Sequence, residues 1–132
     1  MKRALVIGGT GFIGVNLIDA LLSEGVSVRV TTRPSSATLL LRKRAVERVP
    51  ASLEEPEALC RAMDGCDTVF VAGGYYPRYS LSLEAALAEG VPGVKNACDA
   101  ALAVGVERFV YTSTIATLGP APAGRPADER DV

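Results

Sequence analysis

The chain has 132 residues, a formal net charge of −1 and a hydrophobic content of 48%, enough for one domain with its own core and too short for two. A nearly neutral chain has no overall attraction for nucleic acid or for an anionic membrane surface, and no apolar run approaches the ~20 residues of a membrane span. We therefore expect neither nucleic acid nor membrane among its partners.

Cysteine and histidine usage excludes several kinds of site. The three cysteines, Cys60, Cys66 and Cys98, have no C-x-x-C spacing, and the chain has no histidine. A zinc site, a disulfide framework and Ser-His-Asp or Cys-His chemistry are therefore not expected. We expect no metal, three buried thiols and a cytoplasmic location, because residues 1–3 lead directly into the first strand and leave no room for a signal peptide.

Residues 5–14 have the sequence Leu-Val-Ile-Gly-Gly-Thr-Gly-Phe-Ile-Gly, and the chain is organised around them. A strand is predicted over Arg3–Ile7 and a helix over Gly11–Glu24. Glycines between them let the backbone approach a pyrophosphate, and the helix N-terminus offers unpaired N–H groups. We interpret the turn as a dinucleotide site; a tight turn without a ligand is the alternative. The predicted contacts are Gly8, Thr10, Gly11, Phe12, Ile13 and Gly14.

A second strand is predicted over Val26–Thr32, parallel to the first because a helix connects the two. Arg33 ends this strand, where a dinucleotide fold contacts the adenosine ribose. A guanidinium pairs with a 2′-phosphate, whereas a carboxylate would select a 2′-hydroxyl. Arg33, with Ser35 and Ser36 close behind it, therefore favours NADP over NAD. A solvated arginine at a strand end is the alternative.

The alternation of strands and helices continues through the middle of the chain. A short strand is predicted over Ala45–Val49, followed by a helix over 52–64 with Ser52 as its cap and Glu55 in the capping box. Thr68–Ala72 is a nearly continuous apolar run, which is typical of a central parallel strand buried on both faces.

The segment Gly73-Gly74-Tyr75-Tyr76-Pro77 follows this fourth strand. Ligands of open α/β sheets bind outside the carboxyl ends of the strands. Ala72, Gly73 and Gly74 are therefore predicted to let the ribose and nicotinamide part of the cofactor lie on bare backbone. A turn with no ligand role is the alternative.

The last third of the chain holds a helical stretch and one more strand. Residues 82–104 have helical character, but Gly90-Val91-Pro92-Gly93 interrupts them, and proline costs ~3 kcal/mol inside a helix. We expect a kink or two helices, the second over Pro92–Ala103. A fifth strand is predicted over Arg108–Thr112, and a loop from Gly119 onward.

Three of these segments, Gly8–Gly14, Arg33 and Arg108–Gly119, resemble the extended short-chain dehydrogenase/reductase family. The similarity is to its NAD(P)-dependent sugar epimerase/dehydratase and dihydroflavonol-4-reductase-like branch, and to hopanoid-associated sugar epimerases at Ala116–Gly119. The resemblance spans nearly the whole chain. It implies an α/β fold, a Rossmann-like three-layer sandwich whose parallel sheet has about five strands in the order 3-2-1-4-5, and one NAD(P)-binding domain over 1–132.

The resemblance also assigns roles to side chains. In that family a serine or threonine after the fifth strand hydrogen-bonds the substrate oxygen, which points to Thr114 as catalytic, with Ser113 as second choice. A Tyr-x-x-x-Lys pair then supplies the general acid/base, and it is absent here because no lysine follows Lys95. Ser52 stands where the family has an aspartate that meets adenine, and Gly90 replaces a usual asparagine.

The implied function is an NADP-dependent oxidoreductase or epimerase that transfers hydride to or from a sugar-nucleotide or a small carbonyl/hydroxyl substrate. We expect residues 1–132 to be the N-terminal portion of such an enzyme, truncated before the later strands, with the fifth strand as an exposed edge. The family usually forms dimers, so a homodimer is implied. One alternative is a non-catalytic NADP-sensing or scaffolding module; another is a degenerate half that binds no dinucleotide.

Overall fold

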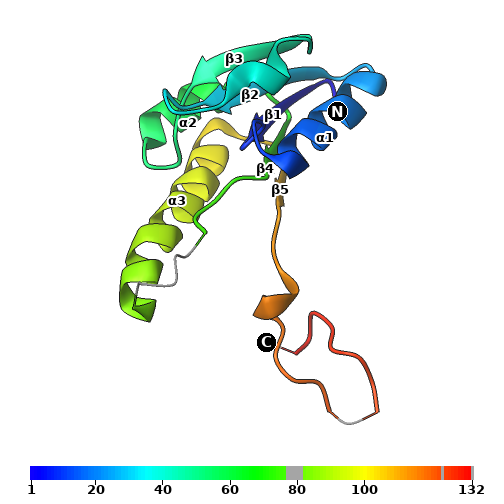
Figure 1. Ribbon diagram of the computed structural model, residues 1–132, viewed down its shortest axis with the longest axis vertical. Coiled ribbons are helices and arrows are strands. Elements are labelled where there is room, and N and C mark those ends of the chain that lie inside the picture. Colours follow the sequence, from blue (N-terminus) through cyan, green and yellow to red (C-terminus); the bar gives the residue numbers. More distant parts are fainter. Residues whose placement is uncertain (77–81, 123, 132) are drawn as a thin grey trace.

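The computed structural model describes residues 1–76, 82–122 and 124–131. Within them lies a five-stranded sheet in which every neighbouring pair is parallel, in the order β3-β2-β1-β4-β5 (Figure 1). The predicted strand order is therefore confirmed. The strands are β1 Arg3–Ile7, β2 Ser27–Thr32, β3 Val46–Pro50, β4 Thr68–Val71 and β5 Arg108–Tyr111.

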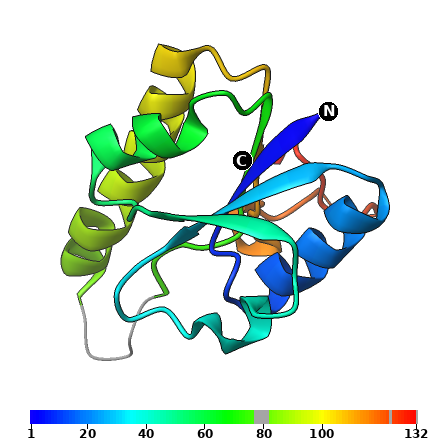
Figure 2. The same cartoon turned by 90° about the horizontal axis from the view of Figure 1, so that it is seen from above.

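Helices cover both faces of the sheet and make the three layers that the sequence predicts. On one face lie α1 (Phe12–Ser23) and the 3-10 helix η1 (Thr38–Leu41); α2 (Pro56–Met63) and α3 (Leu83–Val104) lie on the other (Figure 2). A second 3-10 helix, η2 (Ile115–Thr117), follows β5. In the parts of the chain that the structure describes, no helix is long and apolar enough to cross a membrane.

The core has two halves because successive side chains of β1 point to opposite faces of the sheet. Leu5 packs in the cluster that contains Leu59 of α2, and Val6 packs in the cluster that contains Ile18 of α1; all four side chains are fully buried. The central strand is thus fixed by burial on both sides, and its carboxyl end is held in register beside that of β4, where Ile7 pairs with Val71.

Helix α3 is continuous over 22 residues, so the predicted second helix starting at Pro92 does not exist. Pro92 lies on the exposed side of the helix, where its missing N–H costs one hydrogen bond and no core contact. The glycines around it serve close packing instead. A Cβ would come within 3.1 Å of Tyr75 at Gly90 and within 3.2 Å of Leu53 at Gly93.

Helix α2 begins at Pro56, four residues later than predicted, and Glu55 is its N-cap without any side-chain cap. The capping role predicted for Ser52 is therefore wrong. The Ser52 hydroxyl accepts the Glu54 N–H at 3.3 Å, and its carbonyl accepts the Glu55 N–H at 3.1 Å, which makes a turn. Pro56 explains the late start, because proline suits the first helical position and disfavours a helical conformation of the residue before it.

Strand β5 lies at an edge of the sheet with apolar side chains exposed, as predicted. Val110 is 46% exposed and Tyr111 44%, and Ile115 in the segment that leads away from the sheet is 86% exposed (Figure 1).

The cysteines differ from prediction in their burial. Cys66 is buried, and burial raises the pKa of its thiol, but Cys60 and Cys98 are only partly buried. All three are free thiols.

Asp67 fixes the start of the central strand. Its carboxylate accepts the backbone N–H of Lys2 at 2.6 Å and that of Arg3 at 3.1 Å, and the hydroxyl of Thr68 at 2.8 Å. These hydrogen bonds, the one from Lys2 above all, lower the pKa of Asp67 to about 2.

A carboxylate whose pKa is lower in the folded than in the unfolded chain stabilises the fold above its unfolded pKa, about 4, and loses that contribution as the pH falls through the folded value. We expect Asp67→Asn to lower the free energy of unfolding by about 1 kcal/mol at pH 7. The difference from wild type should shrink between pH 4 and pH 2. Urea unfolding at several pH values measures the loss of stability and its dependence on pH, and Glu24→Gln, at an exposed residue, is the control. A loss of stability that did not change with pH would contradict the role given to the Asp67 carboxylate.

Candidate functional site

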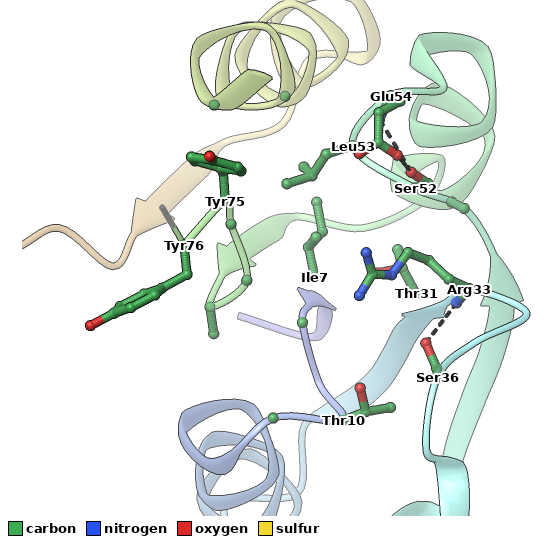
Figure 3. A pocket seen from close by; sticks show the side chains of 18 of the residues that line it. Ile7, Thr10, Thr31, Arg33, Ser36, Ser52, Leu53, Glu54, Tyr75 and Tyr76 are labelled. Carbon is green, nitrogen blue, oxygen red and sulfur yellow. Dashed lines mark hydrogen bonds between the residues drawn. The ribbon is translucent and has the colours of Figure 1, made fainter. Parts of the chain in front are cut away.

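A cavity of about 410 Å³ opens at the carboxyl ends of β1, β2, β3 and β4 (Figure 3). This is where open α/β sheets bind ligands, and the volume falls within the range of small-molecule sites. Four loops and one turn of α3 surround it. Its lining residues are Ile7, Gly8, Thr10, Gly11, Thr31, Arg33, Ser36, Ala51, Ser52, Leu53, Glu54, Ala72, Gly73, Gly74, Tyr75, Tyr76, Glu89, Gly90 and Gly93.

Two positions where β1 leads into α1 admit only glycine, one in the turn and one in the first turn of the helix. Gly8 has a φ of +85°, and a Cβ there would come within 2.5 Å of the Gly73 nitrogen. A Cβ at Gly14 would come within 2.3 Å of the Gly8 carbonyl oxygen. Because both obstacles are backbone, no side-chain movement can relieve them. Glycine at position 14 was predicted to let the helix pack close against the strand; the backbone that it approaches is the turn directly after the strand, at Gly8 and Gly9.

Helix α1 begins directly after this turn, and no side chain of the described residues caps its N-terminus. Gly11 is its N-cap without a side-chain cap, and the first turn contains no acidic residue. The first N–H groups of a helix have no acceptor within the helix, and the helix dipole favours an anion there. Phe12 and Ile13, 87% and 51% exposed, do not line the cavity, whereas Gly11 before them does; a contact of these two residues with a cofactor stays a prediction.

Arg33 directs its guanidinium into the cavity (Figure 3). In the described ranges this guanidinium makes no ion pair and no hydrogen bond. The Ser36 hydroxyl accepts the Arg33 N–H at 2.8 Å, and the Ser36 N–H donates to the Arg33 carbonyl at 2.9 Å. Ser36 therefore lines the cavity and Ser35 does not. These two hydrogen bonds make a β-turn over Arg33–Ser36. Pro34 favours the second position of a β-turn, so it is the residue of the sequence that indicates this turn.

The loop between β3 and α2 forms another part of the cavity wall. Ser52, Leu53 and Glu54 line the cavity there, and the Ser52 hydroxyl donates to the Glu54 carboxylate. The amide of Asn96 in α3 donates to the Leu53 carbonyl at 2.9 Å, which ties the loop to the helix. Sequence reasoning did not predict Leu53 or Glu54 as site residues, because the short loop over residues 51–55 contains no glycine and carries no ligand signal.

The end of β4 supplies the floor of the cavity. Ala72, Gly73 and Gly74 line it, as predicted from the sequence. Gly73 also has an internal reason to be glycine, since a Cβ there would come within 2.9 Å of the Gly8 Cα, whereas Gly74 has open space around it. Pro77, the last residue of the expected turn, lies outside the described residues.

Ser113 and Thr114 lie apart from the cavity, in a shallow hollow that they share with Ile115, Thr117 and Leu118. Both are exposed, and the Thr114 hydroxyl accepts the Ala116 N–H at 3.3 Å as the cap of η2. They follow the carboxyl end of β5, which lies beside the carboxyl end of β4, because the preceding residue, Thr112, donates its N–H to the Val71 carbonyl at 3.0 Å.

These features together fit a dinucleotide. A turn that leaves no room for side chains, a helix N-terminus without a cap and an unpaired guanidinium are the groups that a pyrophosphate and a phosphorylated ribose require. Among the described residues, no side chain caps this helix and none pairs with the guanidinium, and both border one cavity.

Comparison with known proteins agrees with this geometry. Residues 4–132 match the NAD dependent epimerase/dehydratase family. The chain is 36% identical over 121 residues to cinnamoyl-CoA reductase 2 of Arabidopsis thaliana, covering 86% of this chain and 36% of that protein. Two solved structures are similar. The structure of gox2253 has 32% sequence identity and a TM-score of 0.84, and the match covers 98% of this chain and 39% of that one. UDP-glucose 4-epimerase of Thermus thermophilus in complex with NAD has 27% sequence identity and a TM-score of 0.77, and the match covers 98% of this chain and 43% of that one.

The chain spans about a third of the length of the curated relatives that it matches, between 32% and 37% of each.

The two glycines on either side of Phe12-Ile13 give a matched test of the turn. We expect Gly14→Ala to lower the free energy of unfolding by about 3 kcal/mol, because its Cβ meets backbone that cannot move away. Gly11→Ala has its nearest neighbour at 3.4 Å and should change stability by less than about 1 kcal/mol. Urea unfolding of both variants without ligand measures the two free energies of unfolding. Equal losses of stability in the two variants would show that the close approach at Gly14 is not what requires glycine.

Proposed function

Because the chain belongs to the NAD dependent epimerase/dehydratase family, within the extended short-chain dehydrogenases/reductases, we propose that it is the NADP-binding part of an oxidoreductase or epimerase. Its substrate class would be a sugar-nucleotide or a small carbonyl/hydroxyl compound. The observation that carries the choice of cofactor is the Arg33 guanidinium, which is directed into the cavity without an anionic partner among the described residues.

The residues for holding the dinucleotide divide between backbone and side chain. The turn at Gly8, Thr10 and Gly11 and the first N–H groups of α1 would bind the pyrophosphate, with Gly14 keeping the helix close. Arg33 and Ser36 would contact the adenosine ribose, and Ala72, Gly73 and Gly74 the second half of the cofactor. The bound cofactor supplies hydride chemistry at its nicotinamide ring.

Electrostatics supports NADP over NAD. A 2′-phosphate on the ribose would gain a charge-assisted, bidentate pair with Arg33. No acidic residue immediately follows β2 to accept a 2′-hydroxyl, since the residues there are Arg33, Pro34 and Ser35. The Thermus thermophilus epimerase was solved with NAD, so the proposed preference of this chain for NADP rests on the side chains that follow β2.

The substrate oxygen would be bound by the hydroxyl of Thr114, with Ser113 as the second candidate. Both stand at the carboxyl edge of the sheet, directly after β5. A proton donor for that oxygen is not provided by residues 1–132, because no tyrosine is followed by a lysine four positions later. We therefore propose that turnover needs residues beyond these, in line with relatives about three times as long.

The missing Tyr-x-x-x-Lys pair also favours a second candidate, a non-catalytic module that senses NADP or serves as a scaffold. The two differ in what cofactor binding does. A sensor would bind a partner protein in proportion to bound NADP, whereas the enzyme part would gain activity only within a chain that supplies the tyrosine and lysine.

The choice of cofactor is tested by titrating NADPH and NADH into wild type and Arg33→Ala by isothermal calorimetry. We expect wild type to bind NADPH more tightly than NADH, and Arg33→Ala to lose about tenfold or more in NADPH affinity, because a hydrogen-bonded charge is removed. Affinity for NADH should stay within about threefold. The preference for NADPH should also weaken as salt is raised.

Arg42→Ala is the matched control, since Arg42 is exposed and does not line the cavity. An equal loss for both dinucleotides in Arg33→Ala, or an equal loss in both arginine variants, would overturn the assignment of Arg33 to the 2′-phosphate. If neither dinucleotide bound wild type, the proposed function itself would be wrong.

A further inference from the structure

The face of β2 that is turned toward α2 carries polar side chains. Val28 and Val30 pack on the other face, in the core cluster on the α1 side, and side chains alternate along a strand. Arg29 and Thr31, and Arg33 directly after the strand, therefore share the face toward α2. Among the described residues, none of β2 belongs to the core cluster on that side. Because a strand inside a parallel sheet is normally apolar on both faces, each of these polar side chains needs a reason.

Within the part of the chain that the structure describes, three polar or charged residues are buried, namely Arg29, Thr31 and Thr68. The Arg29 guanidinium donates to two backbone carbonyls at the end of α2, at 2.7 and 2.8 Å. The Thr68 hydroxyl donates to the Asp67 carboxylate at 2.8 Å. Thr31 differs from both: it is only 7% exposed, yet its hydroxyl makes no hydrogen bond within residues 1–76, 82–122 and 124–131.

The Thr31 hydroxyl can be reached from the cavity. Thr31 is one of the residues that line it, and Figure 3 shows its side chain near that of Arg33. In the described ranges, the side-chain oxygen or nitrogen that is fully enclosed without a hydrogen bond is the Tyr75 hydroxyl alone. The Thr31 oxygen also lacks a hydrogen bond but is not enclosed, and the open space that Thr31 borders is the cavity. A ligand there can supply the missing hydrogen bond.

The burial of Thr31 indicates which kind of group it would bind. Arg33 is exposed, whereas Thr31 lies two residues earlier, within the sheet, and is buried. A phosphate loses much of its hydration when it is buried, so it suits the exposed guanidinium. A threonine hydroxyl is neutral and both donates and accepts hydrogen bonds, so it suits a neutral polar group, such as a ring nitrogen or a sugar hydroxyl. With the ribose phosphate at Arg33, that group belongs to the same nucleoside.

We propose that Thr31 is a ligand-binding residue of the cavity, whose hydroxyl hydrogen-bonds a neutral polar group of the adenosine moiety. Arg33 selects the 2′-phosphate, and Thr31 binds the part that NADPH and NADH have in common. The two side chains, on one face of one strand, thereby divide recognition of the nucleoside between charge and neutral hydrogen bonding. This inference rests on the proposed dinucleotide site.

The test is Thr31→Val, which replaces the hydroxyl by a methyl group of similar size. Without ligand we expect the melting temperature to stay the same or rise, because an unpaired polar group is lost at a buried strand position. Affinities for NADPH and for NADH should both fall about three- to tenfold. Affinity for adenosine 2′,5′-bisphosphate, which lacks the nicotinamide half, should fall by the same factor. Isothermal calorimetry measures all three.

Thr32→Val is the matched control. Thr32 is the next residue of the same strand and does not line the cavity, and its hydroxyl donates to the Val49 carbonyl at 3.5 Å. We expect its three affinities to equal those of wild type. An equal loss of affinity in Thr32→Val would show that any change in this strand weakens binding and would overturn the proposal.

The other outcomes separate this inference from the proposed function. If wild type bound none of the three compounds, the dinucleotide site would fail and this inference with it. If wild type bound them and Thr31→Val bound all three as tightly, only the role of Thr31 would be overturned. A loss confined to the two 2′-phosphorylated compounds would assign the hydroxyl to the phosphate, and a loss confined to the two dinucleotides would assign it to the nicotinamide half; either would overturn the proposal. So would a lower melting temperature of ligand-free Thr31→Val, which would reveal a partner within the protein.

Discussion

The contact on which the site depends is between two stretches of bare backbone. Gly8 at the end of β1 and Gly73 just after β4 approach so closely that a Cβ on either would collide with the other's main chain. The paired ends of these two strands, Ile7 beside Val71, bring the glycines together. Gly14 lets the first turn of α1 pack directly against Gly8. The floor of the cavity is therefore peptide backbone, whose N–H groups and dipoles have fixed positions before any ligand arrives.

The sequence predicted this part of the molecule well, because its signals are local. Glycine spacing between an apolar run and an amphipathic helix specifies strand, turn and helix within about a dozen residues. Arg33 was identifiable for the same reason, as the residue that ends a clear strand. The order of the strands followed from right-handed crossovers and from the family resemblance, and the sheet agrees with it.

The predictions that failed concern residues whose roles depend on distant parts of the chain. Pro92 with two nearby glycines resembled a helix break, yet the glycines are there because Tyr75 and Leu53 pack against them. Ser52 resembled a helix cap, yet Pro56 delays the helix and leaves Ser52 in a turn at the cavity wall. Tyr75 drew no attention as a site residue because nothing in its neighbours along the chain shows that its hydroxyl is buried. The packing of the two glycines and the burial of Tyr75 require knowing where α3 crosses the loops, whereas Pro56 is a local signal for the late start of α2.

The hydrogen bond from Asn96 to the Leu53 carbonyl has a consequence for the geometry of the cavity. At its other end, α2 is held by Arg29, whose guanidinium donates to the carbonyls of Ala62 and Asp64 at 2.7 and 2.8 Å. The loop carrying Leu53 is thus clamped to the long helix in front and to the sheet behind. Because Asn96 belongs to α3, the position of the Leu53 side of the cavity depends on how α3 packs against the sheet.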